Sequence, residues 1–218
     1  MGYGVKVEVW GDYALFSRPE LKTERVSYDV ITPSAARGIL DAILWHPGMQ
    51  WVIDRIHVLN PISFTNVRRN ELKNKLTKSD MEKMVYSGVV PFQVSGDSEK
   101  IMQRASLMLK DVRYVIEAHF VLTDKASPSD TPEKFYNMAL RRLRKGQCYH
   151  QPCLGTRECT AHFRIVEGDV PPAIDETRDL GLMLYDLDYS NPEDIQPMFF
   201  RARLDCGVME VANCEVFR

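Results

Sequence analysis

Residues 111–124, DVRYVIEAHFVLTD, decide the fold of this chain. β-branched and aromatic side chains fill the segment, which favours a pleated, half-buried strand. Residues 130–147, DTPEKFYNMALRRLRKGQ, follow with apolar side chains at helical spacing and a basic last turn that suits a helix C-terminus. We therefore predict a sheet with helices against it. His119 stands inside the strand, and on this stretch alone a satisfied core histidine is a better interpretation than a proton-transfer group.

Four earlier segments extend the pattern. Residues 5–11, VKVEVWG, alternate apolar and charged side chains as an amphipathic strand does, and residues 31–47, ITPSAARGILDAILWHP, carry helix signals at both ends. Residues 51–64 return to strand character, and residues 66–90 read as a polar, basic loop with one helical stretch. The order of strand, helix, strand, loop, strand, helix is typical of the split βαβ, ferredoxin-like arrangement.

The character of the chain changes after residue 145. Short apolar runs separated by prolines suggest antiparallel strands that complete the sheet or form a small second one. We predict an α+β protein with a ferredoxin-like, RRM-like domain at 1–145 and a C-terminal antiparallel β-rich region at 146–218.

Composition narrows the class of protein. The chain has 218 residues, of which 44% are hydrophobic and 27% charged, as in globular proteins. No apolar run reaches the roughly 18 to 20 residues of a membrane helix, and the first residues lack the apolar core of a signal peptide. Five cysteines, an odd number, fit reduced thiols better than a disulfide framework. We expect a cytoplasmic protein without a membrane partner.

Charge is unevenly distributed along the chain. The net charge is −2, which alone argues against a dedicated nucleic-acid binder. Residues 67–78 and 141–145 are nevertheless strongly basic, whereas residues 167–194 are acidic. Such polarity can make one face attractive to phosphates, although solvated helix faces explain the counts equally well.

Two clusters suggest metal sites, and neither has convincing spacing. Structural zinc usually needs Cys-x-x-Cys or His-x(3–5)-His pairs, which are absent from the cluster formed by Cys148, His150, Cys153, Cys159 and His162. Asp186 and Asp188 would share one face of a strand and could bind Mg²⁺, but an exposed acidic strand is the simpler interpretation. We predict no metal and no cofactor.

The remaining signals point weakly to RNA. A strand histidine, basic segments and Trp45 beside His46 form the combination with which a ferredoxin-like scaffold holds single-stranded RNA. From residue chemistry alone, RNA binding is a hypothesis.

Five stretches together carry a more specific resemblance. In chain order they are VEVWGDYALFSRPE, ERVSYDVITPSAARGILDAILWHP, VIDRIHVLNPISFTNVRRNE, DVRYVIEAHF and GQCYHQPCLGTRE. They resemble the fifth family of CRISPR-associated (Cas) proteins in its d subtype, also called c, the repeat-RNA endoribonuclease of type I-C systems. The resemblance covers most of residues 3–160 and is looser beyond.

The resemblance implies a fold and an activity. It implies an N-terminal ferredoxin-like domain of the RAMP type and metal-independent cleavage of precursor CRISPR RNA at the base of the repeat hairpin. The protein would then stay on the 5′ handle of the mature CRISPR RNA as a subunit of the Cascade surveillance complex. Its neighbours there would be the backbone subunit of the seventh Cas family and the large subunit of the eighth, with DNA contact left open.

The resemblance also implies catalytic positions. The family combines a tyrosine near the end of the first helix with a lysine and a histidine on the strand that matches EAHF. The histidine matches His119, whereas the other two positions fall on Leu44 and on or beside Ala118. His46 or Tyr13 could replace the missing groups if the helix end and the first loop converge.

These residues define two hypotheses. In the first, the protein is an endoribonuclease with His119 as general acid or base, because a histidine suits either role near neutral pH and the RNA 2′-hydroxyl is a built-in nucleophile. Phosphate contacts are expected from Arg37, Arg68, Arg69 and Arg104, and a stacking surface from Trp45. In the second, the protein only binds the 5′ handle. A metal-dependent nuclease using Asp186 and Asp188 is a third, weaker alternative.

Overall fold

The computed structural model describes residues 3–21, 24–73, 77–88 and 101–218. Within these ranges no helix has the length and apolar character needed to cross a membrane. The elements are, in chain order, β1 (Gly4–Ala14), β2 (Arg25–Val26), α1 (Pro33–Ile43), β3 (Met49–Val58), β4 (Phe64–Leu72), α2 (Lys78–Ser87), β5 (Ile101–Leu122), α3 (Pro132–Lys145), β6 (His162–Ile165), β7 (Arg178–Asp188), β8 (Gln196–Leu204), β9 (Val208–Glu210) and β10 (Val216–Phe217).

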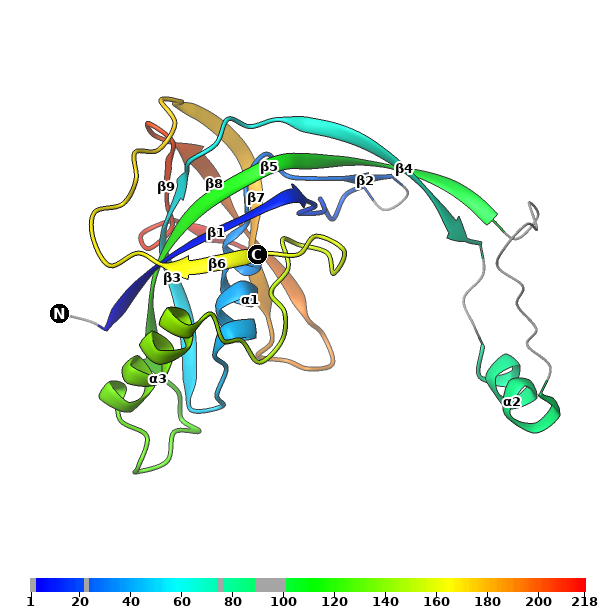
Figure 1. The fold of residues 1–218 in the computed structure, drawn as a ribbon, viewed down its shortest axis with the longest axis horizontal. Coiled ribbons are helices and arrows are strands. Elements are labelled where there is room, and N and C mark those ends of the chain that lie inside the picture. The colour runs from blue at the N-terminus through cyan, green and yellow to red at the C-terminus, as the bar shows by residue number, and fades with distance from the viewer. Residues whose placement is uncertain (1–2, 22–23, 74–76, 89–100) are drawn as a thin grey trace.

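The larger sheet is organised around β5. Its strand order is β6-β1-β5-β3-β9, and β2 and β4 also pair with β5. Every neighbouring pair is antiparallel except β2 with β5. The strand expected at 111–124 is confirmed, but β5 starts well before it, at Ile101. This one strand therefore spans both the body of the protein and the projection beside it (Figure 1).

Alternation along β5 separates a core face from a polar face. Tyr114, Ile116, Ala118 and Phe120 are buried on the face that α1 and α3 cover. The ring of Phe120 packs edge-on against Phe135 of α3, with 6.2 Å between ring centroids. Successive side chains of a strand point to opposite faces, so His119 must lie on the face away from both helices.

The two predicted helices form as their end signals indicate. Thr32 caps α1, with its side-chain oxygen accepting a hydrogen bond from the Ala35 N–H, and Thr131 caps α3 in the same way through Lys134. Each helix begins with a proline, whose fixed φ suits the first turn. At the end of α3, Gly146 adopts a left-handed conformation with φ of 61°, which only glycine adopts readily.

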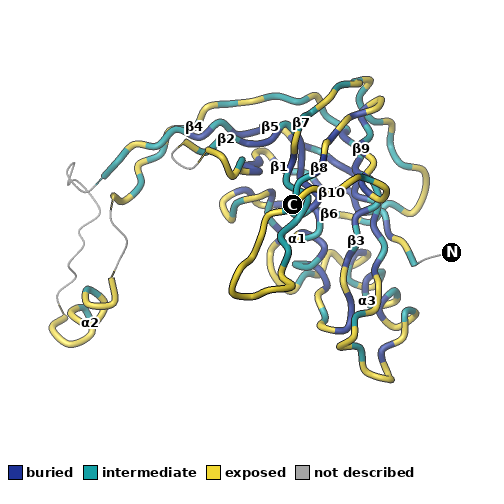
Figure 2. The backbone as a smooth tube through the Cα atoms, turned by 180° about the vertical axis from the view of Figure 1, so that it is seen from behind, coloured by how far each residue is buried: buried dark blue, intermediate teal, exposed yellow. Residues whose placement is uncertain are grey.

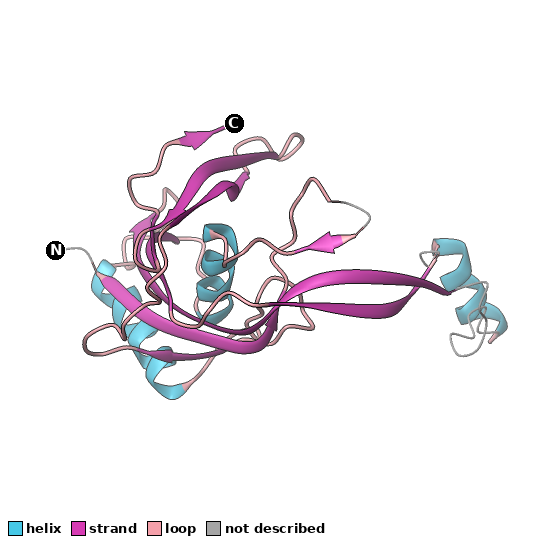
Figure 3. Ribbon diagram, turned by 90° about the horizontal axis from the view of Figure 1, so that it is seen from above, coloured by secondary structure: helices cyan, strands magenta, loops and turns pink. Residues whose placement is uncertain are grey.

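The smaller sheet has the order β10-β8-β7. Viewed from above, α1 lies between this sheet and the larger one (Figure 3). Residues after 145 also supply β6 and β9 to the larger sheet, and a single hydrophobic cluster includes side chains from both halves of the chain. A division at residue 145 therefore does not separate one sheet from the other.

An arm projects from the body where a loop was expected. Residues 64–72 form β4, which pairs with the first part of β5, and α2 lies at the far end of this ribbon (Figure 1). The expectation of a loop over 66–90 was wrong there, because β5 supplies a partner strand that local composition does not reveal. Residues 74–76 and 89–100, which include part of the basic stretch, lie outside the described residues. The arm is largely exposed, whereas buried residues concentrate in the body (Figure 2).

Candidate functional site

His119 lies on the polar face of the larger sheet and pairs with a carboxylate. Its Nδ1 atom is 2.8 Å and 3.0 Å from the two carboxylate oxygens of Asp54 on β3. The two side chains are about one-third exposed, at 35% and 34%. No described residue provides a hydrogen-bond partner for Nε2 of His119. The imidazole thus presents one anchored nitrogen and one free nitrogen, as proton transfer requires.

A β-bulge brings Asp54 to this position. The register of β3 against β5 shifts between Ile53 and Arg55, so that Asp54 is the extra residue. Its carbonyl oxygen accepts hydrogen bonds from the N–H groups of Val211 and Ala212, just after β9. Bulges redirect a side chain locally and are frequent near functional sites. The bulge therefore turns the Asp54 carboxylate toward the face that carries His119.

Strand β1 leaves space beside the imidazole and supplies a cation. Gly4 pairs directly with His119, so β1 places no side chain opposite the ring, whereas Val52 stands opposite it on β3. Lys6 pairs with Glu117 and is thus a diagonal neighbour of His119, at a Cα separation of roughly 7–8 Å that a lysine side chain can span. No described residue forms an ion pair with Lys6. The lysine ammonium is free to meet an anion placed above Gly4.

A second histidine–carboxylate pair lies on the same face. The His57 Nε2 atom is 2.9 Å from Glu117 Oε1, and Arg55 lies 3.7 Å from the other oxygen of that carboxylate. His57 is only 12% exposed because strands flank it on both sides, with Val115 opposite on β5 and Val208 opposite on β9. This pair has the same chemistry as His119 and Asp54 but little access to a ligand.

The structure does not bring Tyr13 or His46 to His119. The interval from Gly4 to Tyr13 along β1 spans about 30 Å, since a strand rises about 3.4 Å per residue. His46 follows α1, with its ring 5.0 Å from that of Phe135, on the helix-covered side of the sheet. Its Nδ1 atom accepts a hydrogen bond from the Gly48 N–H. The convergence of helix end and first loop that would place either residue at the site is absent.

Leu44 and Ala118, the two positions at which the family pattern expects polar groups, are both buried and apolar. Each is 1% exposed and belongs to the core. Ala118 also points to the helix-covered face, because it is adjacent to His119 in a strand. Neither position offers a proton-transfer group here.

Arg37 is engaged in ion pairs rather than available to phosphate. Its guanidinium donates two hydrogen bonds to Asp186 of β7, at 2.7 Å and 2.8 Å, and one to Asp41 at 2.8 Å. The hydrogen bonds to Asp186 raise the pKa of Arg37, whereas burial raises the pKa of the Asp41 carboxyl. Arg37 thus ties α1 to the smaller sheet.

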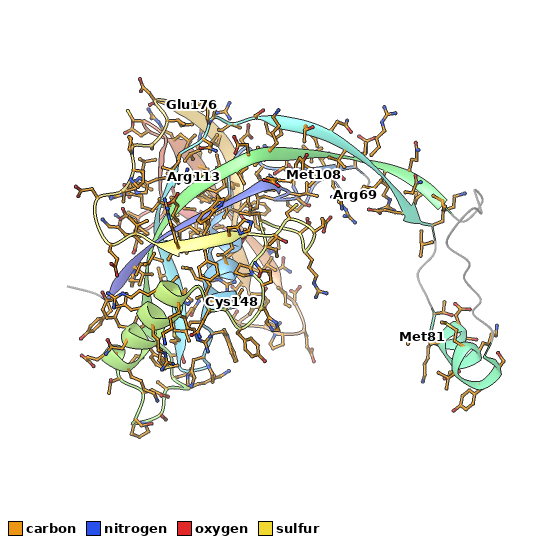
Figure 4. All side chains as sticks on the ribbon, in the orientation of Figure 1. Arg69, Met81, Met108, Arg113, Cys148 and Glu176 are labelled. Carbon is orange, nitrogen blue, oxygen red and sulfur yellow. The ribbon has the colours of Figure 1, made fainter. Side chains whose placement is uncertain are left out.

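The other three arginines lie on the arm. Arg69 forms an ion pair with Glu158 at 2.6 Å, at the root of the arm (Figure 4), and Arg104 lies 3.5 Å from Glu71. Arg68 is exposed, and no described residue partners it. From Arg104 to His119 the path along β5 is about 50 Å, so the arm cannot contact the same phosphate as the imidazole.

Trp45 is available for stacking but lies on the helix side. It is 62% exposed and lines a groove of about 640 Å³ between α1, the open edge of β3 and the β7–β8 strands. His46, Trp51 and Lys125 line the same groove. Trp45 and His46 are therefore together, as the sequence places them, in a groove whose lining also includes Val52, the residue that pairs with His119 on β3.

The candidate metal ligands are dispersed or occupied. Among the described residues, no group of three or more His, Cys, Asp or Glu side chains is arranged to hold a metal ion. Cys159 is buried within the loop that follows α3, and burial raises the pKa of its thiol. Asp186 binds Arg37, and Asp188 forms an ion pair with Arg218 at 3.0 Å.

Asp54 and Lys6 were not recognised from the sequence. Both occupy strands whose alternation gives ordinary exposed positions, and only strand pairing places them beside His119. The one local signal is an aspartate in VIDRIHV, a residue type that is depleted in strands.

Sequence comparisons identify the relatives of this chain. Residues 4–212 match the sequence model of the Cas5d family, described as CRISPR-associated protein (Cas_Cas5). A CRISPR pre-crRNA endoribonuclease Cas5d from Mannheimia succiniciproducens is 48% identical over 217 residues, covering 97% of this chain and 96% of that protein. A protein of the same name from Thermus thermophilus is 43% identical over 224 residues, covering 95% of this chain and 90% of that protein.

Solved structures share the fold. A functionally uncharacterized protein from Streptococcus mutans superposes with a TM-score of 0.69 at 23% identity, covering 99% of this chain and 97% of that one. A structure described as a CRISPR-associated protein gives a TM-score of 0.69 at 24% identity, covering 99% and 96% of the two chains. At these identities the likeness concerns the fold alone.

Proposed function

Because this chain belongs to the Cas5d family of CRISPR-associated proteins, we propose that it is an endoribonuclease that cleaves precursor CRISPR RNA at the base of the repeat hairpin, without a metal ion. The relatives that carry this name cover nearly the whole chain, including both sheets. The ferredoxin-like, RAMP-type interpretation of residues 1–145 belongs to the same proposal, and the antiparallel order β6-β1-β5-β3 supports it.

The observation that carries the proposal is the His119 imidazole. It is anchored through Nδ1, free at Nε2 and faces a gap at Gly4. In the reaction, the 2′-oxygen forms a bond to phosphorus while the bond from phosphorus to the 5′-oxygen breaks. His119 Nε2 accepts the 2′-proton or donates a proton to the leaving 5′-oxygen, a contribution worth about 10²–10⁴-fold. The products are a 2′,3′-cyclic phosphate and a 5′-hydroxyl.

We propose that Lys6 stabilises the negative charge that develops on the reacting phosphate. A cation fixed near developing negative charge stabilises the transition state. Lys6 is unpaired among the described residues and lies diagonal to His119 across the β1–β5 pairing. In this chain it takes the place of the lysine that the family pattern puts at the position of Ala118.

The arm and the helix side would bind RNA away from the cut. Arg68 is the best phosphate contact of the four predicted arginines, because the ion pairs of Arg37, Arg69 and Arg104 would have to open first. Trp45 offers an exposed ring for an unpaired base. After cleavage the protein would remain on the 5′ handle as a Cascade subunit, beside the subunits of the seventh and eighth Cas families.

The test is cleavage of repeat RNA by the purified protein in EDTA. We expect full activity and products that end in a 2′,3′-cyclic phosphate, since the 2′-hydroxyl is the nucleophile. Loss of cleavage in EDTA, with recovery on adding Mg²⁺, would contradict the metal-independent mechanism.

One observation favours a second function. Leu44 and Ala118 bury apolar side chains where the family pattern has a tyrosine and a lysine. A protein that only binds the 5′ handle would show nanomolar to micromolar affinity for the repeat RNA and no cleavage in the same assay. Cyclic-phosphate products that persist in wild type and vanish in His119→Ala would exclude it.

A further inference from the structure

We propose that Asp54 is a positioning residue that orients His119 and fixes which of its nitrogens carries out proton transfer. The inference rests on the proposed endoribonuclease activity and concerns the same site. It assigns Nε2 as the reacting atom and Nδ1 as the anchored one. Neither the family match nor the names of the relatives designates this aspartate.

The geometry fixes the tautomer of the neutral ring. Both carboxylate oxygens of Asp54 lie within hydrogen-bond distance of Nδ1, at 2.8 Å and 3.0 Å. An ionised carboxylate can only accept, so the Nδ1 proton must point at it. The neutral ring therefore carries its proton on Nδ1 and keeps the lone pair of Nε2 for the RNA.

The backbone holds Asp54 in place. The residue sits at the bulge of β3, and its carbonyl oxygen accepts from Val211 N at 2.9 Å and from Ala212 N at 3.0 Å. These contacts tie the bulge to the segment that follows β9. The carboxylate thus sits on a short side chain fixed at its base, as a group that orients a catalytic histidine should.

The carboxylate also stabilises the charged ring. When Nε2 takes the 2′-proton, the ring becomes an imidazolium beside an anion; when Nε2 donates, that imidazolium is the starting state. In both directions the carboxylate of Asp54 accepts a hydrogen bond from Nδ1–H and does not itself become protonated. Water exchanges the other proton: it protonates the leaving 5′-oxygen when Nε2 takes the 2′-proton, and it takes the 2′-proton when Nε2 donates.

Among the described residues, few other charged side chains share the strand positions around the ring. They are Lys6 on β1, Glu117 on β5 and Arg55 on β3, while Gly4 contributes none. The carboxylate of Glu117 is already paired with His57 and Arg55. An effect of replacing Asp54 can therefore be assigned to the loss of that one carboxylate.

The experiment measures single-turnover cleavage of repeat RNA, with enzyme in excess. We compare wild type with Asp54→Asn, Asp54→Glu and His119→Ala, and use Glu117→Gln as the matched change in the second pair. Asp54→Asn should lower the limiting rate by about 100-fold or more, since a misoriented or wrongly protonated histidine loses most of its general acid–base contribution. RNA affinity, measured separately, should change less than about threefold, because Asp54 itself makes no contact with phosphate.

Rescue and the position of the ring proton distinguish positioning from a merely structural role. Asp54→Asn replaces a group that only accepts by an amide that can also donate to Nδ1, so ¹⁵N NMR should no longer show the neutral His119 ring protonated on Nδ1 alone. Asp54→Glu, which keeps the carboxylate, should restore part of the rate and the wild-type protonation pattern. Glu117→Gln should keep the rate within about threefold, as expected for a change that spares acid–base catalysis.

Two results would overturn the proposal. One is Asp54→Asn with the wild-type rate while His119→Ala is inactive; if His119→Ala also cleaves normally, the proposed function fails instead. The other needs no variant: ¹⁵N NMR of wild type should show the neutral His119 ring protonated on Nδ1, and a ring protonated on Nε2 contradicts the assignment even where Asp54→Asn does not fold.

Discussion

Two histidine–carboxylate pairs on one face of the sheet differ mainly in access. His119 with Asp54 and His57 with Glu117 have similar nitrogen–oxygen distances of 2.8 Å and 2.9 Å. The first pair is about one-third exposed and lies beside Gly4, whereas His57 is 12% exposed and enclosed between β5 and β9. A histidine hydrogen-bonded to a carboxylate is therefore not sufficient to make a catalytic site. Room for a phosphate and a free ring nitrogen distinguish the two.

Replacing each histidine by glutamine tests this comparison with the largest expected effect. His119→Gln should lower single-turnover cleavage about 10²–10⁴-fold, the usual contribution of general acid–base catalysis. His57→Gln should keep the rate within about threefold, yet lower stability by roughly 1 kcal/mol through its lost hydrogen bond. Rates and thermal midpoints measured on both variants check this; a slower reaction in His57→Gln than in His119→Gln would reverse the roles of the two pairs.

Filling the gap at Gly4 should remove the access that distinguishes His119. A Cβ at this position meets only the Ala118 carbonyl oxygen at 3.5 Å, an ordinary contact. Gly4→Leu should therefore fold but occupy the space beside the imidazole, lowering cleavage about 100-fold because small displacements of a reacting group are that costly.

Gly4→Ala is the control for this variant and should stay within about threefold of the wild-type rate, since it adds one methyl group without displacing the reacting atoms. Equal cleavage by Gly4→Leu and wild type would show that the substrate does not approach across β1.

Lys6 is the cation that we place beside the reacting phosphate at His119. Lys6→Gln should lower the cleavage rate about tenfold, less than the loss of a rigid oxyanion donor because the lysine side chain is flexible. Lys6→Arg should recover most of the rate. The measurement is the single-turnover rate at saturating enzyme, and a change in RNA affinity alone would assign Lys6 to binding instead.

The arm should affect binding without affecting chemistry. Arg68→Ala should weaken RNA affinity and reduce the salt dependence of binding by about one counterion, as for one lost phosphate contact. Arg201 on β8 is a matched control, because it is exposed but paired with Asp179. Titrations at several salt concentrations test this, and an unchanged salt slope for Arg68→Ala would remove the arm from the RNA path.

The smallest predicted effect is the loss of stability in acid when the ion pair between Arg69 and Glu158, at the base of the arm, is broken. Burial acts to raise the pKa of Glu158, but hydrogen bonds from its own N–H and from Arg69 outweigh it and lower the pKa. The ion pair with Arg69 should thus stabilise the fold above about pH 4.3, the ordinary glutamate value, and be lost as pH falls through the lower folded value.

Thermal midpoints of wild type and Glu158→Gln measured from pH 3 to 7 check this. The difference should be largest at neutral pH, equivalent to about 0.2–1 kcal/mol for such an exposed pair, and vanish in acid. A difference that grows toward acid pH would contradict the sign.

The sequence predicts the elements better than their distant contacts. Thr32, Pro33 and Pro47 mark the first helix, and the composition of 111–124 marks a strand. The β4 strand was missed because its partner lies beyond residues 74–100, and long-range pairing leaves no local trace. The site shows the same limit: the role of His119 was predicted from the family resemblance, whereas Asp54 depends on a bulge and Lys6 on register.

Residue type also misled in places. Arg37 has the chemistry of a phosphate contact, yet Asp186, far along the chain, occupies its guanidinium. Tyr13 has the chemistry of an acid or base, yet it lies about 30 Å along β1 from the imidazole. Such distances follow from topology, which composition and local periodicity do not contain.

The most direct test of the account is a structure of the protein with repeat RNA that carries a 2′-deoxy group at the scissile nucleotide, which blocks cleavage. We predict that the scissile phosphate lies above Gly4, and that His119 Nε2 either lies within about 3.2 Å of the leaving 5′-oxygen, directly or through one water, or faces the 2′-carbon that lacks the attacking oxygen. A scissile phosphate held instead on the helix side, beside Trp45 and His46, would contradict it.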